Sequence, residues 1–238
     1  MSPNTEAFDA TRALRRDLAL ALRAAHHHGL SEGICNHFSV ALPDGSERFL
    51  INPQGLHWSE IGENDIVMVD SGEEDAPVAT RSRPPLSLFT PPCIASRARP
   101  AYCIPTCPTQ RLTVTQARAL EPVFHSVPCA SRAASASMRA TTAWRSMPPR
   151  ASASPRGADV AFLADHGLIV CGESLDLNYI ERACQLQILA AASGSSLAPV
   201  EPEVAERTTT QTRGERQQSR LFFESLRRRL PVSSSGAQ

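Results

Sequence analysis

The sequence predicts one domain of mixed α/β class, and three observations support that prediction. The chain has 238 residues, a common length for one domain with a sizeable core. Residues 11–28 and 179–192 carry apolar side chains at helical spacing. Short runs that favour strands occupy 38–42, 48–51, 66–69, 160–163 and 168–171.

The helix predicted at 11–28 has a start signal, an apolar stripe and an end signal. Thr11 or Asp9 can cap its beginning, and Gly29 stands where a left-handed residue commonly ends a helix. Its last residues are histidines, and three consecutive residues do not share one helix face. The favourable interaction of histidine with the negative end of the helix dipole therefore explains their position better than metal binding does. The predicted stripe consists of Leu14, Leu18, Leu22 and Ala25, and the histidines are His26, His27 and His28.

The second helix, at 179–192, is predicted to end before Gly194. A Pro43-Asp44-Gly45 turn separates the first two predicted strands. Residues 195–238 are predicted to form a partly helical segment with a disordered tail at 233–238. The buried stripe of the second helix is predicted to consist of Ile180, Ala183, Leu186 and Ile188 or Leu189.

Composition argues against two classes of partner. The 24 basic residues, all arginine, balance 24 acidic residues, so no net charge favours nucleic acid or a membrane surface. No apolar run is long enough for a membrane-spanning helix, and residues 1–9 lack the apolar core of a secretion signal. We therefore expect a cytoplasmic protein. Its seven cysteines show no paired Cys-x-x-Cys spacing and are expected to be reduced.

Residues 76–157 differ from both flanks. They hold 13 of the 19 prolines, four of the seven cysteines and 11 arginines, but one acidic residue, Glu121. A folded domain mixes both signs of charge over its surface. As written, this block is expected to be disordered or misfolded. One explanation is a genuine Pro/Arg/Ser-rich insertion that is disordered or binds a partner.

The flanks resemble the class II aldolase/adducin N-terminal family. The resemblance lies in the first helix and in three segments that occur in the family's order and spacing. It implies that residues 10–194 form one domain, a three-layer α/β/α sandwich around a mostly antiparallel sheet, usually assembled as a homo-tetramer. The segments are GICNHFSV at 33–40, LINPQGLHWSEI at 50–61 with DIVMVD at 65–70, and VAFLADHGLIV at 160–170 with ERACQ at 181–185.

The resemblance also implies a site. Family aldolases hold a divalent metal, typically zinc, with a mid-chain His-x-His pair and a third histidine, which maps onto His166. The pairs that grip the substrate phosphate map onto Cys35-Asn36 and Gln54-Gly55, so Asn36 and Gly55 are the expected substrate-binding residues. The first member of each pair departs from the family pattern, which puts a phosphorylated substrate in doubt. His37 is expected to be structural.

Three neutral imidazoles leave zinc its charge and open positions, where a hydroxyl and a carbonyl of a substrate can bind. The metal then stabilises the negative charge that forms when a carbon–carbon bond breaks. In this chain residues 76–157 contain a single histidine, His125, and no His-x-His pair. One of the three expected zinc ligands is therefore present.

A shift of reading frame can account for the missing pair. The last base of each codon from Cys103 to Pro105, joined to the first two of the next, can encode His-Ser-His. Three neighbouring stretches, read in the same way, also gain family-like residues. Two compensated slips, at about residues 81 to 111 and 127 to 157, would restore the family pattern.

We therefore expect a metal-dependent aldolase-like lyase that acts on a small hydroxy-carbonyl, sugar-like substrate and is impaired in this chain. Loss of sheet strands would also reduce core burial, so the chain as written is expected to fold poorly. The alternative is a non-catalytic, adducin-like interaction module or a decayed pseudoenzyme. A nucleic-acid-binding insert is disfavoured because the arginines lack interleaved aromatic residues.

Overall fold

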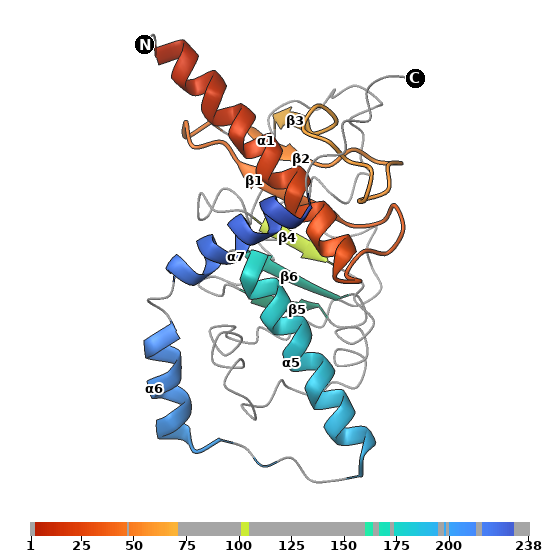
Figure 1. Cartoon of the computed structure of the whole chain (residues 1–238), viewed down its shortest axis with the longest axis vertical. Coiled ribbons are helices and arrows are strands. Elements are labelled where there is room, and N and C mark those ends of the chain that lie inside the picture. Colours follow the sequence, from red (N-terminus) through yellow and green to blue (C-terminus); the bar gives the residue numbers. More distant parts are fainter. Residues whose placement is uncertain are drawn as a thin grey trace, which may run out of the picture.

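An antiparallel sheet lies at the centre of the structure, a computed structural model (Figure 1). The residues that the structure describes are 3–46, 48–70, 101–104, 160–163, 167–171, 174–194, 198, 200–212 and 216–230. Their elements are α1 (Pro3–His27), β1 (His37–Ala41), β2 (Arg48–Ile51), β3 (Val67–Asp70), β4 (Ala101–Ile104), β5 (Val160–Leu163), β6 (Gly167–Cys171), α5 (Ser174–Ala192), α6 (Pro202–Thr212) and α7 (Arg216–Arg229).

The six described strands are ordered β3-β2-β1-β4-β6-β5, and each neighbouring pair is antiparallel. Five of these strands lie where the sequence predicts them. The sixth, β4, lies inside the block that we expected to be disordered or misfolded, so that expectation is wrong for residues 101–104. The physical reason is local: Ala-Tyr-Cys-Ile is an apolar run bounded by Pro100 and Pro105, which are tolerated at strand ends.

The hairpin between β1 and β2 closes through the predicted Pro43-Asp44-Gly45 turn. Asp44 accepts hydrogen bonds from the backbone N–H of Ser46 at 2.9 Å and from its hydroxyl at 2.6 Å, and Gly45 has a φ of 73°. These hydrogen bonds, with that from Arg48, lower the pKa of Asp44 to about 2. The turn fixes the register of the hairpin, in which Ser39 faces Ile51.

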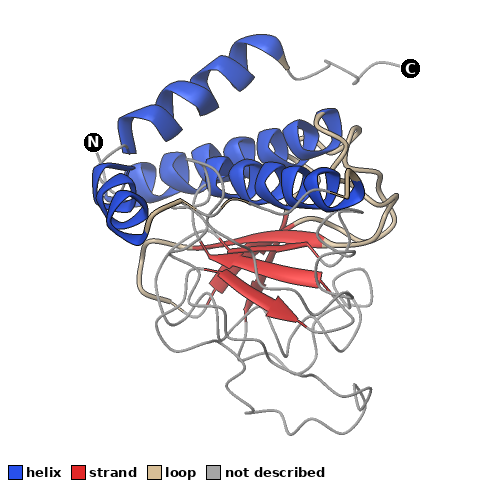
Figure 2. Ribbon diagram, turned by 90° about the horizontal axis from the view of Figure 1, so that it is seen from below, coloured by secondary structure: helices blue, strands red, loops and turns tan. Residues whose placement is uncertain are grey.

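The helices lie on one face of the sheet (Figure 2). α1 contacts β1 and β2, and α7 contacts both α1 and α5. Successive residues of β1 and β2 are nevertheless buried on both faces, as Phe38 and Ser39 are on β1. The structure thus describes helices over an antiparallel sheet, and the predicted helical layer on each face stays a prediction.

α1 starts at Pro3, six residues before Asp9 and eight before Thr11, the two predicted caps. Proline is well placed there because the first helical N–H groups have no intrahelical partner. The predicted end is confirmed: Gly29 has a φ of 74°, its N–H binds the carbonyl of His26, and the N–H of Leu30 binds the carbonyl of Ala25 at 2.8 Å. This pair of bonds is a Schellman motif, in which the last carbonyls of a helix are satisfied.

One core connects α1, the sheet and α5. The predicted stripe of α1 is confirmed, with Leu18, Leu22 and Ala25 buried and Leu14 partly buried against them. Phe38 and Trp58 meet at the centre of this core, with ring centroids 4.7 Å apart. Burying two aromatic side chains of this size is worth several kcal/mol by area.

The predicted stripe of α5 is correct in part. Ile180 and Ala183 are buried, but Leu186 and Leu189 are 38% and 59% exposed. The helix begins at Ser174. Its buried face follows the helical period and includes Leu177 near the start of the helix. That face continues through Cys184 and Gln187, so hydrophobicity alone placed the stripe too far round the helix.

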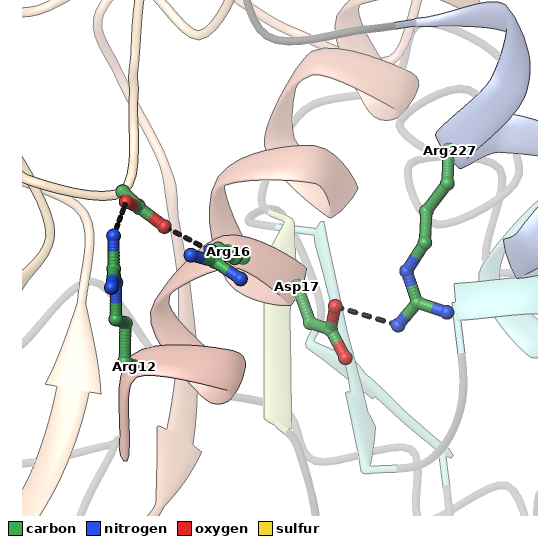
Figure 3. A network of polar contacts seen from close by, with 5 residues as sticks. Arg12, Arg16, Asp17 and Arg227 are labelled. Carbon is green, nitrogen blue, oxygen red and sulfur yellow. Dashed lines mark hydrogen bonds and ion pairs between the residues drawn. The ribbon is translucent and has the colours of Figure 1, made fainter. Parts of the chain in front are cut away.

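α7 is held on α1 by an apolar contact and an ion pair. Leu226 is 2% exposed and packs against Leu20 and Ala24. Arg227 donates to Asp17 at 2.7 Å and also lies over the ring of Phe223 (Figure 3). Within the described part of the chain, no helix combines the length and the apolar character needed to span a membrane.

We predict that Leu226→Ala lowers the free energy of unfolding by about 2 to 5 kcal/mol, because it leaves a cavity between α7 and α1. Arg227→Ala should cost at most about 1 kcal/mol, since both partners of its ion pair are substantially exposed. Urea denaturation of the full chain measures both values. Equal losses in the two variants would contradict apolar anchoring of α7.

Candidate functional site

The two turns predicted to bind substrate lie at the same end of the β1–β2 pair. Asn36 directly precedes β1, and Gly55 follows β2 by four residues. Because the strands are antiparallel with Ser39 facing Ile51, the beginning of β1 and the end of β2 meet at one sheet edge. The structure thus brings Asn36 and Gly55 to a common edge, which we call the substrate edge.

The register extends this edge across the sheet. On the other side of β1, His37 faces Cys103 near the end of β4, and Ile104 in turn faces Leu168 at the beginning of β6. Leu163, the last residue of β5, pairs with Gly167. The end of β4 and the beginning of β6 therefore lie at the same edge as Asn36. His166, the expected zinc ligand, lies outside the described residues.

The Asn36 turn has an unusual backbone. Asn36 has a φ of 75°, a left-handed conformation that asparagine tolerates better than most residues. Before it, the N–H of Cys35 donates to the carbonyl of Glu32 at 3.0 Å. Cys35 itself is exposed. Gly55 has a φ of 92°, so both turns of the substrate edge contain a left-handed residue.

Asn52, three residues before Gly55, is bonded to the Asn36 turn, and the sequence did not single it out. Its Oδ1 accepts the N–H of Phe38 at 2.9 Å, and its Nδ2 donates to the carbonyl of Asn36 at 3.3 Å. The side chain is 4% exposed. An asparagine before proline is a turn signal, but sequence spacing alone could not show that its amide spans two strands.

His37 is buried in β1 beside the Asn36 turn. Burial lowers its pKa to about 3, because a charged imidazole would lose its hydration. The ring is therefore neutral at pH 7. This agrees with the expectation that His37 is structural.

The loop after Gly55 is tied to α1. Arg23 donates to the carbonyl of Ile61 at 2.7 Å, and Arg15 donates to the carbonyl of Ile66. Farther along, Arg12 and Arg16 both pair with Glu63 (Figure 3). Trp58, fully buried in this loop, packs on Phe38. The polypeptide after the substrate edge is thus fixed to the first helix.

A pair of histidines lies where α1 meets this loop. The rings of His26 and His57 are 4.6 Å apart in an edge-to-face arrangement. Each Nδ1 lies beside a serine hydroxyl, Ser31 for His26 at 2.8 Å and Ser59 for His57 at 2.7 Å. The expected placement of the histidines at the helix end is found for His26 and His27. Among the described residues, no group of three or more histidine, cysteine, aspartate or glutamate side chains could hold a metal ion.

The fold and the gathered turns define an α/β protein with a candidate small-molecule site at one edge of its sheet. The sequence pattern of the Class II Aldolase and Adducin N-terminal domain family matches residues 16–188. The chain therefore belongs to this family, which confirms the resemblance seen in its flanks. Class II aldolases are generally zinc-dependent.

Three similar proteins agree with this assignment. A Pseudomonas aeruginosa protein named for aldolase class 2 is 25% identical over 198 residues, covering 80% of this chain and 76% of the relative. The 5-methylthioribulose-1-phosphate/5-deoxyribulose-1-phosphate aldolase of Rhodospirillum rubrum is 30% identical over 200 residues, covering 81% and 85%. An aldolase II superfamily protein of Pseudomonas syringae shares the fold, with a TM-score of 0.80 at 24% identity, covering 98% of this chain and 96% of that one.

We predict that the free energy of unfolding decreases as the pH is lowered, because of His37. Its pKa in the folded state is about 3, against an ordinary value of 6.5, so the unfolded chain binds a proton that the folded chain does not. His37 should therefore reduce the free energy of unfolding by about 1.4 kcal/mol per pH unit as the pH falls below 6.5. Urea denaturation at pH 7, 6 and 5 measures this slope.

His37→Gln should flatten the slope of stability against pH. The core variant Leu20→Ala should lower the free energy of unfolding by a similar amount at each pH and leave the slope unchanged. An unchanged slope in His37→Gln would show that other groups carry the pH dependence.

Gly55→Ala should cost about 1 to 2 kcal/mol of stability, because a φ of 92° strains any residue with a Cβ. No atom lies within 4 Å of the added methyl group, so the cost is conformational rather than steric. Gly62→Ala is the matched control: it lies in the same loop, its φ is not left-handed, and its nearest contact is 3.4 Å. Thermal melting compares the two, and equal changes would argue against a strained turn at Gly55.

Proposed function

We propose that this chain has the architecture of an aldolase-like lyase for small hydroxy-carbonyl, sugar-like compounds. The observation that carries the proposal is the convergence of Asn36, Gly55 and the beginning of β6 at one sheet edge. Membership of the family supports it, as does the relative from Rhodospirillum rubrum, which is named for cleaving two ketose phosphates. At this edge the two left-handed turns would hold the polar end of a substrate.

The family's zinc does not fit the chain as written. The implied His-x-His pair is absent from residues 76–157, the part of the chain where the family carries it, which leaves His166 as the single expected ligand. One imidazole leaves zinc far short of the three protein ligands that catalytic sites provide. We therefore propose that lyase activity is severely impaired in this chain.

The placement of β4 supports the reading-frame hypothesis. The shifted frame puts His-Ser-His at the codon junctions from Cys103 to Thr106, at and just beyond the end of β4. β4 lies between β1 and β6, and its last residue faces Leu168. A histidine pair encoded there would begin at the substrate edge, beside the strand whose first residue follows His166 in the chain.

A phosphorylated substrate is less well supported than a sugar-like one. Cys35 and Gln54 replace the first members of the two phosphate-gripping pairs, and both have longer side chains. We therefore leave the phosphate open within this proposal. We also propose that the protein forms a homo-tetramer, as the resemblance implies, and that it is cytoplasmic, as its composition suggests.

The second candidate is a non-catalytic, adducin-like interaction module. One specific observation favours it: the family match is kept while two of the three implied zinc ligands are missing. Such a module should neither bind zinc tightly nor lose any property when a chelator is added.

Sequencing the gene across codons 70 to 185 distinguishes the two candidates. We expect small insertions and deletions that, once corrected, restore His-Ser-His near codons 103 to 106. If the bases instead encode the chain as written, the lyase proposal falls for this molecule and the interaction module is favoured.

At the protein level, the frame-corrected chain should bind Zn²⁺ at least about 100-fold more tightly than the chain as written, because it gains two ligands. Competition with a chromophoric chelator measures both affinities. His166→Ala should weaken binding by the corrected chain and leave the chain as written unchanged, with His27→Ala as the matched control. Tight zinc binding by the chain as written, lost in His166→Ala, would contradict the proposed impairment.

A further inference from the structure

Asn52 stands at a point where the strand ladder ends. β2 ends at Ile51, and continuing its register places Asn52 opposite Phe38. The following residue is Pro53, which has no N–H to donate. At the last position of the pair, the Phe38 N–H donates to Oδ1 of the Asn52 side chain, so a side-chain amide supplies the acceptor there.

The orientation of this amide is fixed by its partners. The Phe38 N–H can only donate, so the atom facing it at 2.9 Å must be Oδ1. The carbonyls of Asn36 and Pro53 can only accept, at 3.3 Å and 3.5 Å from Nδ2. A buried amide whose two ends have opposite requirements cannot flip without losing these bonds.

These bonds hold the Asn36 turn to the chain just before the Gly55 turn. Asn36, whose φ of 75° is held against the preference of most residues, directs its carbonyl at Asn52. Three residues after Asn52 comes Gly55, with a φ of 92°. The placement of the Asn36 turn beside the chain that leads to Gly55 therefore rests on the β1–β2 register and on the Asn52 side chain, which is 4% exposed.

We propose that Asn52 is a positioning residue that fixes the Asn36 turn relative to the Gln54–Gly55 turn and so sets the width of the substrate edge. The inference rests on the proposed function for what the edge binds, but the positioning itself is a property of the fold. A hydroxy-ketone held between the turns would contact groups whose spacing Asn52 determines, while Asn52 itself stays buried beneath them.

Two substitutions distinguish the contributions of the oxygen and the nitrogen of the Asn52 amide. Asn52→Asp keeps an oxygen for the Phe38 N–H but presents a second oxygen to the Asn36 carbonyl, so the Asn36 turn should loosen alone. Asn52→Leu removes both contacts, so both the turn and the Phe38 N–H should lose protection. Leu20→Ala, at the contact of α1 with α7, is the matched control for a general loss of stability.

Amide hydrogen exchange of the full chain, followed residue by residue by NMR, tests the positioning. In Asn52→Leu the Phe38 N–H should exchange about 10-fold faster or more, relative to amides in the core of α1. In Asn52→Asp the Phe38 N–H should stay within about 3-fold of the parent protein. The proposal is overturned if the Phe38 N–H is unprotected in the parent protein. It is also overturned if Asn52→Leu speeds exchange uniformly, as Leu20→Ala should.

Titration with dihydroxyacetone, and separately with dihydroxyacetone phosphate, tests the link to the proposed function. Either probe should shift the amide resonances of Asn36 and Gly55 in the parent protein, and about 10-fold more of it should be needed in Asn52→Leu at temperatures where both remain folded. Equal affinities in the two proteins would overturn the role at the substrate edge. If neither probe binds the parent protein while the exchange pattern is as expected, the positioning stands and the proposed function fails.

Discussion

The antiparallel register of β1 with its two neighbours is the constraint on which the rest of the structure depends. β1 pairs with β2 on one side and β4 on the other, and each pairing brings a chain segment to the substrate edge. The same strand carries Phe38 into the core and His37 next to the Asn36 turn. Because side chains alternate along a strand, a slip of one residue would exchange these two positions and place an imidazole in the apolar core.

The consequences of that register extend beyond the sheet. Phe38 packs on Trp58, and the loop carrying Trp58 is bonded to α1 through Arg15 and Arg23. Burial lowers the pKa of Arg23, so its contact with Ile61 costs hydration and is worth forming only where the loop is already placed. The apolar core sets the position, and the buried polar contacts make that position specific.

Much of this fold could be predicted from local pattern, and the exceptions have physical causes. The stripe of α1 and the strands flanking the central block follow short-range periodicity, which the sequence carries directly. β4 is four residues between prolines, and a segment this short shows no periodicity that would distinguish a strand from a loop. The outward position of Leu189 depends on where α5 begins and packs. At the site, the prediction that Asn36 and Gly55 bind substrate came from the resemblance, whereas the bonds of Asn52 depend on a pairing between two strands and could not be predicted from sequence spacing.

The bonds from α1 to the loop that contains Ile61 also allow proteolysis to show whether this loop is bound to the helix. Trypsin cleaves after lysine or arginine, and this chain contains arginine alone. Arg23 lies in a helix with its guanidinium bonded to the Ile61 carbonyl, so a protease can reach that peptide bond only after the loop has left α1. The order in which tryptic fragments appear therefore records which part of the molecule opens first.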